Sequence, residues 1–229
     1  MTQLLSLIGF GLIFTILRPS LAAQSLQSWP EVDTYLQLNS NVRISFFGAL
    51  TRENAEGASA EIGPNIDFFF MPLVKLKRIT AFELDQSKSR PVMLRLLYRY
   101  LPAVEGPTER RVGLEATGRF PLIRGVLLSD RNRADLRNID GVFSWRYRNR
   151  FSAERSFSLR SFHFAPYLRA EAFYDSRFEK FSRTELTIGS TFPVGKHFEL
   201  EWYYMHQNDT AKAPNRQVDG FGYVLSMYF

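Results

Sequence analysis

Apolar and polar side chains alternate at every second position along most of this chain. Because consecutive side chains of a β-strand point to opposite faces, each such segment predicts a strand with one apolar and one polar face. In one segment, for example, Leu200 and Trp202 alternate with Glu199 and Glu201. No long segment keeps the 3.6-residue apolar period of an amphipathic helix. The pattern therefore predicts an all-β protein.

The alternation is clearest in residues 220–229, where one alternate set is large and apolar and the other is smaller. The apolar set is Phe221, Tyr223, Leu225, Met227 and Phe229. This stretch resembles the closing strand of bacterial outer-membrane β-barrels, which ends in Phe after alternating aromatic or aliphatic residues. The resemblance implies that these five residues form an assembly signal bound by the barrel assembly machinery.

The lengths of the alternating segments predict about twelve strands, each long enough to cross a bilayer at a tilt. An even number closes an antiparallel ring with both ends on one side, and ten strands is the alternative count, since 76–85 and 125–131 alternate least clearly. Short turns with Pro and Gly at 121–125 and 193–197 face one side, and polar connections at 130–139, 175–181 and 207–217 face the other. The predicted strands are 31–38, 42–52, 58–70, 76–85, 91–101, 109–120, 125–131, 140–153, 163–174, 182–193, 197–207 and 217–229.

Alternation is compatible with two architectures. In an exported soluble binding sandwich the apolar face is internal, whereas in a membrane barrel it faces lipid and the charged face lines the lumen. Aromatic residues near the strand ends and charges of both signs within single strands favour one antiparallel transmembrane barrel with a lumen largely filled by charged side chains.

Composition fits a barrel of one domain. The chain has 229 residues, of which 45% are hydrophobic, 15% aromatic and 23% charged. Leu4 to Leu17 is uncharged and too short for a comfortable membrane span, and small residues follow, so residues 1–23 are predicted to be a cleaved signal peptide. An uncleaved anchor is the alternative. Residues 24–229 would then form the barrel in the outer membrane.

The net charge of +6 does not indicate a nucleic-acid partner, because the arginines recur at alternate positions inside aromatic segments instead of forming one patch. The chain contains no cysteine, and its three histidines have no paired spacing. We therefore expect neither a metal site nor a cofactor.

The charged faces of the strands are the main candidate site. They predict a lumen network of salt bridges, since buried guanidinium groups need carboxylate partners. Arg131, Arg133, Arg137, Asp130 and Asp135 form a cluster shortly before Arg146, Arg148 and Arg150 in the sequence. The functional alternative to a salt-bridge network is an arginine-lined pore for small polar or anionic solutes. The network is predicted to contain Arg95, Arg99, Arg111, Glu115, Arg146, Arg148, Arg150, Arg169, Glu171, Glu185, Glu199 and Glu201.

A second candidate is His206 with Asp209, placed at the outer end of a strand. A rim-active lipid-modifying hydrolase or protease would use such a pair to activate a hydroxyl group, but no hydrolase motif surrounds it. A non-enzymatic protein is the favoured interpretation. Residues 75–78, Lys-Leu-Lys-Arg, are a candidate contact for lipopolysaccharide phosphates if they face outward.

Several phrases in order resemble one family: EIGPNIDFFFMPLVKLKR, LRLLYRYLP, FPLIRGVLLSDRNRADLR, FSWRYRNRFSAER, PYLRAEAFYDSRFEKFSRTELTIG and FPVGKHFELEWYYMHQND. The family is one of uncharacterised outer-membrane β-barrels, a domain of unknown function found in soil bacteria. The resemblance spans roughly residues 29–229 and implies a fold and a compartment, with outer-membrane lipid as the surroundings. It implies no reaction, ligand or catalytic residue, and it leaves the oligomeric state open.

Overall fold

Strands account for most of the computed structural model, which describes residues 25–53, 56–70, 84–102, 106–211 and 213–229. Two short 3₁₀ helices, η1 (Gln86–Ser89) and η2 (Ile123–Gly125), lie between strands. The strands are β1 Ser25–Gln37, β2 Val42–Glu53, β3 Glu56–Phe70, β4 Val92–Leu101, β5 Glu109–Pro121, β6 Val126–Ile139, β7 Val142–Arg155, β8 Phe157–Leu159, β9 Phe162–Asp175, β10 Lys180–Val194, β11 Phe198–Asp209 and β12 Arg216–Tyr228.

Eleven of these strands form a closed ring. Neighbours along the chain pair antiparallel from β1 to β7, β7 pairs with β9, and β9 to β12 continue the antiparallel order. The short β8 pairs only with the start of β9, so it extends a hairpin beyond the ring. The expectation of a single barrel of about twelve strands is confirmed. The ring joins both of its edges, so the chain does not form the alternative sandwich of two facing sheets.

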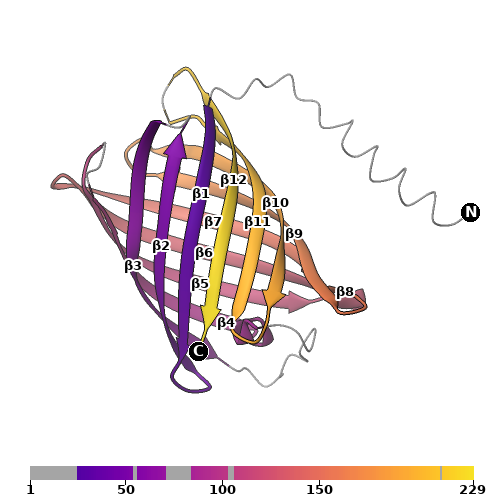
Figure 1. The fold of residues 1–229 in the computed structure, drawn as a ribbon. Helices are drawn as coiled ribbons and strands as arrows, with labels where there is room; N and C mark the ends of the chain where they lie inside the picture. The colour runs from indigo at the N-terminus through magenta and orange to yellow at the C-terminus, as the bar shows by residue number, and fades with distance from the viewer. Residues whose placement is uncertain (1–24, 54–55, 71–83, 103–105, 212) are drawn as a thin grey trace, which may run out of the picture.

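The ring closes through a parallel pair. β1 runs beside β12 from Ser25 opposite Val218 to Tyr35 opposite Tyr228. Figure 1 shows these two strands side by side, both running toward the end of the barrel where the C-terminus lies. The expected antiparallel closure, with the first and last strands meeting head to tail, is therefore wrong. An odd number of strands in the ring requires one parallel contact.

The region between β3 and β4 explains the odd number. The predicted strand 76–85 lies largely outside the described residues, as does the basic stretch 75–78. β3 and β4 pair directly with each other, from Ile62 opposite Tyr100 to Phe70 opposite Val92. No strand can therefore stand between them in the wall.

The second correction concerns β6. Residues 130–139 were expected to form a polar connection, but they continue β6 to Ile139, and the following turn is a tight one at Asp140 and Gly141. Both residues of this turn have positive φ, the conformation that two-residue hairpin turns require. The segment looked like a loop because β6 carries polar side chains on both of its faces.

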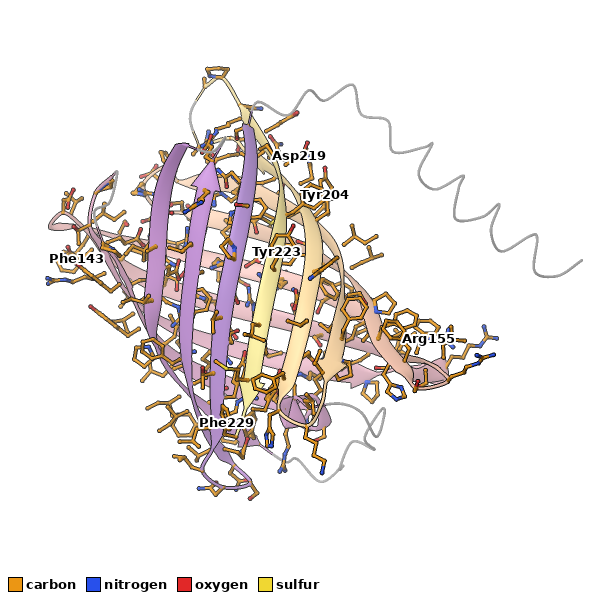
Figure 2. The ribbon with its side chains drawn as sticks, viewed as in Figure 1. Phe143, Arg155, Tyr204, Asp219, Tyr223 and Phe229 are labelled. Carbon is orange, nitrogen blue, oxygen red and sulfur yellow. The ribbon has the colours of Figure 1, made fainter. Side chains whose placement is uncertain are left out.

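Burial alternates along the strands and defines an inside and an outside. In β5 the buried positions include Arg111, Glu115 and Arg119, whereas Val112 and Leu114 between them are exposed. Figure 2 shows side chains such as Phe143 and Tyr223 projecting away from the barrel wall. Most of the large apolar side chains are therefore on the outer surface, and most of the charges are internal. Among the described residues, no helix is long and apolar enough to cross a membrane.

Candidate functional site: the charged lumen

The twelve residues predicted for the lumen network all occupy inward-facing positions of their strands. Contacts between strands that are not neighbours show that these side chains meet inside the ring. Arg131 of β6 reaches Glu171 of β9 at 3.0 Å, across β7. Arg111 of β5 reaches Glu61 of β3 at 3.2 Å, across β4.

Glu171 is the centre of the largest cluster. Its side chain is only 3% exposed. It forms ion pairs with three guanidinium groups, at 3.0 Å to Arg131, 2.8 Å to Arg148 and 2.6 Å to Arg150. Arg148 also lies over the ring of Phe173, with its guanidinium carbon 4.6 Å from the ring centroid. One carboxylate thus ties β6, β7 and β9 together.

Glu109 organises a second cluster, nearer the end of the barrel where β5 begins. Arg137 binds both of its carboxylate oxygens, through Nε at 2.6 Å and Nη2 at 2.7 Å, in the bidentate geometry that favours arginine. The third nitrogen of Arg137 donates to Asp175 at 2.9 Å. In the turn after β9, the hydrogen bond from Arg177 to Asp175 raises the pKa of the Arg177 guanidinium.

A third cluster surrounds Asp67, whose side chain is fully buried. Arg43 of β2 contacts it at 2.7 Å and Arg95 of β4 at 2.6 Å. The guanidinium carbon of Arg43 lies 4.4 Å from the ring centroid of Tyr35. Sequence reasoning missed Asp67 and Glu109 as network members, although both follow the alternation and could have been found by extending the polar face of each strand to its end.

The two signs of charge are unevenly distributed around the lumen. Acids and aromatic rings face inward from the opposite wall, where Glu31 and Glu201 lie near Tyr203 and Asp33 lies near Glu31. The inward-facing arginines of β4 to β7 are Arg95, Arg99, Arg111, Arg119, Arg131, Arg133, Arg137, Arg146, Arg148 and Arg150. Some of their donor nitrogens, including Nη2 of Arg133 and Nε of Arg146, are buried without a hydrogen-bond partner.

Helix η1 lies at one mouth of the barrel, at the end where the C-terminus lies (Figure 1). Asp85 caps the helix through the backbone N–H of Ser87 and pairs with Arg43 of β2 at 2.8 Å. Arg119 of β5 donates to the buried Ser87 hydroxyl at 3.1 Å, and Lys88 contacts Glu154 of β7 at 3.0 Å. The helix is therefore attached to three separated strands.

The electrostatics at this mouth favour an ionised Asp85. Burial alone would raise the pKa of the Asp85 carboxyl group, but the neighbouring Arg43, Arg119 and Lys88 outweigh burial and hold the pKa well below its usual range. The attachment of η1 to the barrel is therefore an ionic one at neutral pH.

His206 and Asp209 do not come together. Three residues apart in a strand, they point to opposite faces. Asp209 faces the lumen, where Arg183 contacts it at 2.8 Å, whereas His206 is on the outer surface and its Nδ1 lies 2.7 Å from Asp219 of β12. Tyr204 donates to the same Asp219 oxygen at 2.6 Å. Figure 2 shows Tyr204 and Asp219 near the end of the barrel where β1 begins. The expected catalytic pair is thus replaced by an external His–Asp–Tyr group.

The five residues of the predicted assembly signal share the outer face of β12. Phe221, Tyr223 and Phe229 are each about half exposed, at 51%, 49% and 59%. On the inner face, a Cβ atom at Gly222 would overlap the ring of Tyr203. Gly222 therefore makes room for an aromatic ring of β11.

The charged lumen contains no obvious metal centre: within the described part of the chain, no three His, Cys, Asp or Glu side chains converge as a metal ion would require.

A family model described as "protein of unknown function (DUF2490)" matches residues 89–218, which is more than half of the chain. No curated protein matches the sequence. The match covers β4 to β11, and thus most of the arginine-rich wall.

Proposed function

Because this chain belongs to the DUF2490 family of proteins of unknown function, we propose its role from the barrel itself. We propose that the protein is an integral outer-membrane β-barrel with a closed lumen and a structural, non-enzymatic role. Its outer surface would be solvated by lipid, and its internal salt bridges would keep the barrel rigid and impermeable.

The outer surface carries the main support for this proposal. Large apolar side chains remain exposed on every strand of the ring, up to 67% for Leu136 and 81% for Phe143. A soluble monomer rarely exposes an apolar patch of more than a few hundred Å². The inversion of apolar and polar faces is that of a chain solvated by hydrocarbon.

The backbone supports the same conclusion. In hydrocarbon every N–H and C=O group must find its partner within the protein, which a closed ring of strands achieves and an open sheet does not. The parallel pair β1–β12 supplies those partners at the only place where an edge would remain in the described ring. Bacterial outer-membrane barrels commonly have an even number of strands, so an eleven-strand ring is a variation on that architecture.

The lumen supports a closed barrel. A ring of this size is narrow enough to be filled by long side chains, and the clusters around Glu171, Glu109 and Asp67 bridge separated strands. Helix η1 is held at one mouth by ion pairs to β2 and β7. A lumen filled in this way would not let solutes diffuse through the barrel.

Three measurements test these points separately. Purified protein extracted from membranes should migrate differently in detergent gels before and after boiling, as folded barrels do, and the full chain expressed in a Gram-negative cell should sediment with the outer membrane. Absence from the membrane fraction would overturn the proposal. In planar bilayers, the same protein should give no stepwise conductance above background.

The arginine excess on β4 to β7 favours one second candidate, a narrow pore for small anions. Stepwise currents with anion selectivity, reduced in the variants Arg133→Ala and Arg146→Ala, would support the pore and exclude the closed barrel. These two residues are chosen because each has a buried donor nitrogen without a partner.

The proposed assembly signal has a test of its own. Phe229→Ala should lower the amount of folded barrel in the outer membrane, because the assembly machinery would bind the outward-facing residues of β12 in this proposal. Phe143→Ala removes an even more exposed outward aromatic residue from another strand and should leave the yield unchanged. Equal yields from the two variants would remove the assembly role from Phe229.

A further inference from the structure

A polar cluster interrupts the apolar outer surface on the hairpin of β6 and β7. It consists of Asp130, Asn132, Tyr147 and Asn149, which we call the Asp130 cluster. Asn132 and Asn149 lie directly opposite each other at the middle of the two strands. Strand alternation puts all four on the outward face with Leu136 and Phe151, while the arginines between them face the lumen.

The cluster is held together by its own hydrogen bonds. The amide nitrogen of Asn149 donates to Asp130 at 2.8 Å and to Asn132 at 3.1 Å. The amide nitrogen of Asn132 donates to the other Asp130 oxygen at 3.0 Å, and the Tyr147 hydroxyl donates to Asn132. The Asp130 carboxylate is therefore fixed in place and partly neutralised by two amides.

Small side chains surround the Asp130 cluster. Gly118 of β5 pairs with Asp130 and Ala116 with Asn132, and on the other side Ala172 of β9 pairs with Asn149. Ala134 and Ala153 follow on the same face of β6 and β7. Bulky residues that elsewhere cover the backbone are thus replaced by methyl groups and hydrogen, which allows another backbone to approach closely.

Other outward charges in the described strands are placed differently. Arg52, Arg110 and Arg155 are within two positions of a strand end, and His206 and Asp219 pair with each other. A carboxylate in the middle of a lipid-facing wall is unfavourable unless another polar surface covers it. In a membrane, therefore, the Asp130 cluster would be more stable against the polar surface of a partner than against lipid.

We propose that the outward face of β6 and β7 is the contact surface for a second copy of this chain within the membrane. The proposal rests on the proposed function, because it requires a barrel that spans the bilayer. It commits to a like partner because the cluster is self-complementary: each asparagine amide both donates and accepts hydrogen bonds.

Two-fold symmetry places the charges favourably. A two-fold axis along the membrane normal, running between the two copies in front of the β6–β7 hairpin, sets β6 of one copy against β7 of the other. Asp130 of each copy then faces the Asn149 side of its partner, and the two carboxylates stay apart. The small residues around the cluster let the two walls come close enough for these hydrogen bonds to form.

The absence of cysteine from the chain makes cross-linking a direct test. Ala134→Cys places a thiol beside the Asp130 cluster, and Val32→Cys places one on the outward face of β1, on the other side of the barrel (Figure 1). Both purified variants are reconstituted in lipid vesicles at low protein density and treated with a short bismaleimide. Their heat-modifiable migration is measured first, so that a failure to insert is recognised as a failure of the proposed function.

For inserted protein, Ala134→Cys should form cross-linked dimers roughly ten times more efficiently than Val32→Cys. Replacing Asp130, Asn132 and Asn149 together by Leu in the Ala134→Cys chain should lower the yield to that of the control. Equal yields from the two single variants, or a yield unaffected by the three leucines, would overturn the proposal. A purified chain that stays monomeric but cross-links to a different protein in native membranes would also overturn it.

Discussion

The β11–β12 pair and the β6–β7 pair share one backbone arrangement and differ in almost every other respect. Each is a long antiparallel hairpin with unbroken register. On the β11–β12 wall, Trp202 and Tyr223 face outward and pack edge to face, with ring centroids 5.9 Å apart. On the β6–β7 wall, the corresponding outward positions hold Asn132 and Asn149.

The inner faces differ as well. Behind β11 and β12 the lumen contains aromatic rings, with Tyr203 stacked on Trp29 at 6.4 Å and accommodated by the glycines of β12. Behind β6 and β7 it contains arginines held by Glu171. One wall is therefore stabilised mainly by ring packing and the other by charge pairing, and the same kind of substitution should have different consequences on each.

Removal of the Glu171 carboxylate should have the largest effect. Glu171→Ala leaves three buried arginines without their common partner, and breaking a buried ion pair in this way costs about 3–5 kcal/mol. Urea unfolding in lipid vesicles measures the loss. Glu53→Ala is the matched control, because Glu53 also pairs with an arginine, Arg216, but both side chains are more than a third exposed. A comparable loss in the control would show that the charge network does not stabilise the β6–β7 wall.

Crowding the β11–β12 wall should have the next largest effect. Gly222→Ala puts a methyl group into the ring of Tyr203, and overpacking of this kind costs about 1–3 kcal/mol. Gly48→Ala adds the same methyl group on the outer face of β2, where the nearest neighbour is 4.0 Å away, and should change the unfolding free energy little. Tyr203→Ala should restore tolerance at Gly222. If it does not, ring packing is not what this wall depends on.

The same contrast decides what could be predicted from the sequence. Strands such as β11 and β12 alternate apolar and polar residues so regularly that their bounds were predicted to within two residues. The end of β6 was missed because Asp130 and Asn132 are polar on its outward face, which removes the alternation. The lumen residues could be predicted because the alternation of side chains is enough to assign the charged residues of an aromatic strand to its inner face.

Contacts between distant strands were beyond the sequence pattern. Alternation says that Asp67 and Arg95 face inward, but not that β3 and β4 are neighbours without a strand between them. Because β3 and β4 pair directly, the ring has an odd number of strands and must close through a parallel pair. The connection from β3 to β4, which contains η1, then lies outside the wall. His206 and Asp209 were paired wrongly for a different reason: the predicted strand ended at residue 207, whereas β11 continues to Asp209 and so puts the two side chains on opposite faces.

Acid should weaken the charged side of the molecule first. The pKa of Asp85 is depressed in the folded protein, so its contribution to stability is fully present above the unfolded value of 3.8 and is lost as the pH falls through the folded value. Loss of such charge-assisted hydrogen bonds costs roughly 2 kcal/mol. Helix η1 should then leave the mouth of the barrel while the β11–β12 wall stays folded.

A spin label at Ser89→Cys, in the otherwise cysteine-free chain, measures this release as a mobility that increases progressively as the pH falls below 3.8. Asp85→Asn should show the mobile spectrum at neutral pH as well. A label that stays immobile through the acid range would mean that Asp85 does not hold the helix.

The smallest effect, and the one of opposite sign, should come from the Asp130 cluster. Replacing Asp130, Asn132 and Asn149 by Leu removes polar groups from a wall that would face lipid in the proposed function. The isolated monomer at high lipid dilution should then unfold with unchanged or slightly higher free energy, by roughly 1 kcal/mol. At high protein density the same variant should be less stable than the wild type, because it has lost the dimer that stabilises the folded chain by mass action. A cluster that served only the monomer would cost stability equally at both densities, since its hydrogen bonds would be lost in either case. If the change in unfolding free energy reverses its sign with protein density, the cluster is a contact surface; if it does not, the cluster is an internal polar network. The test concerns the same two strands whose lumen side contains the arginines paired with Glu171.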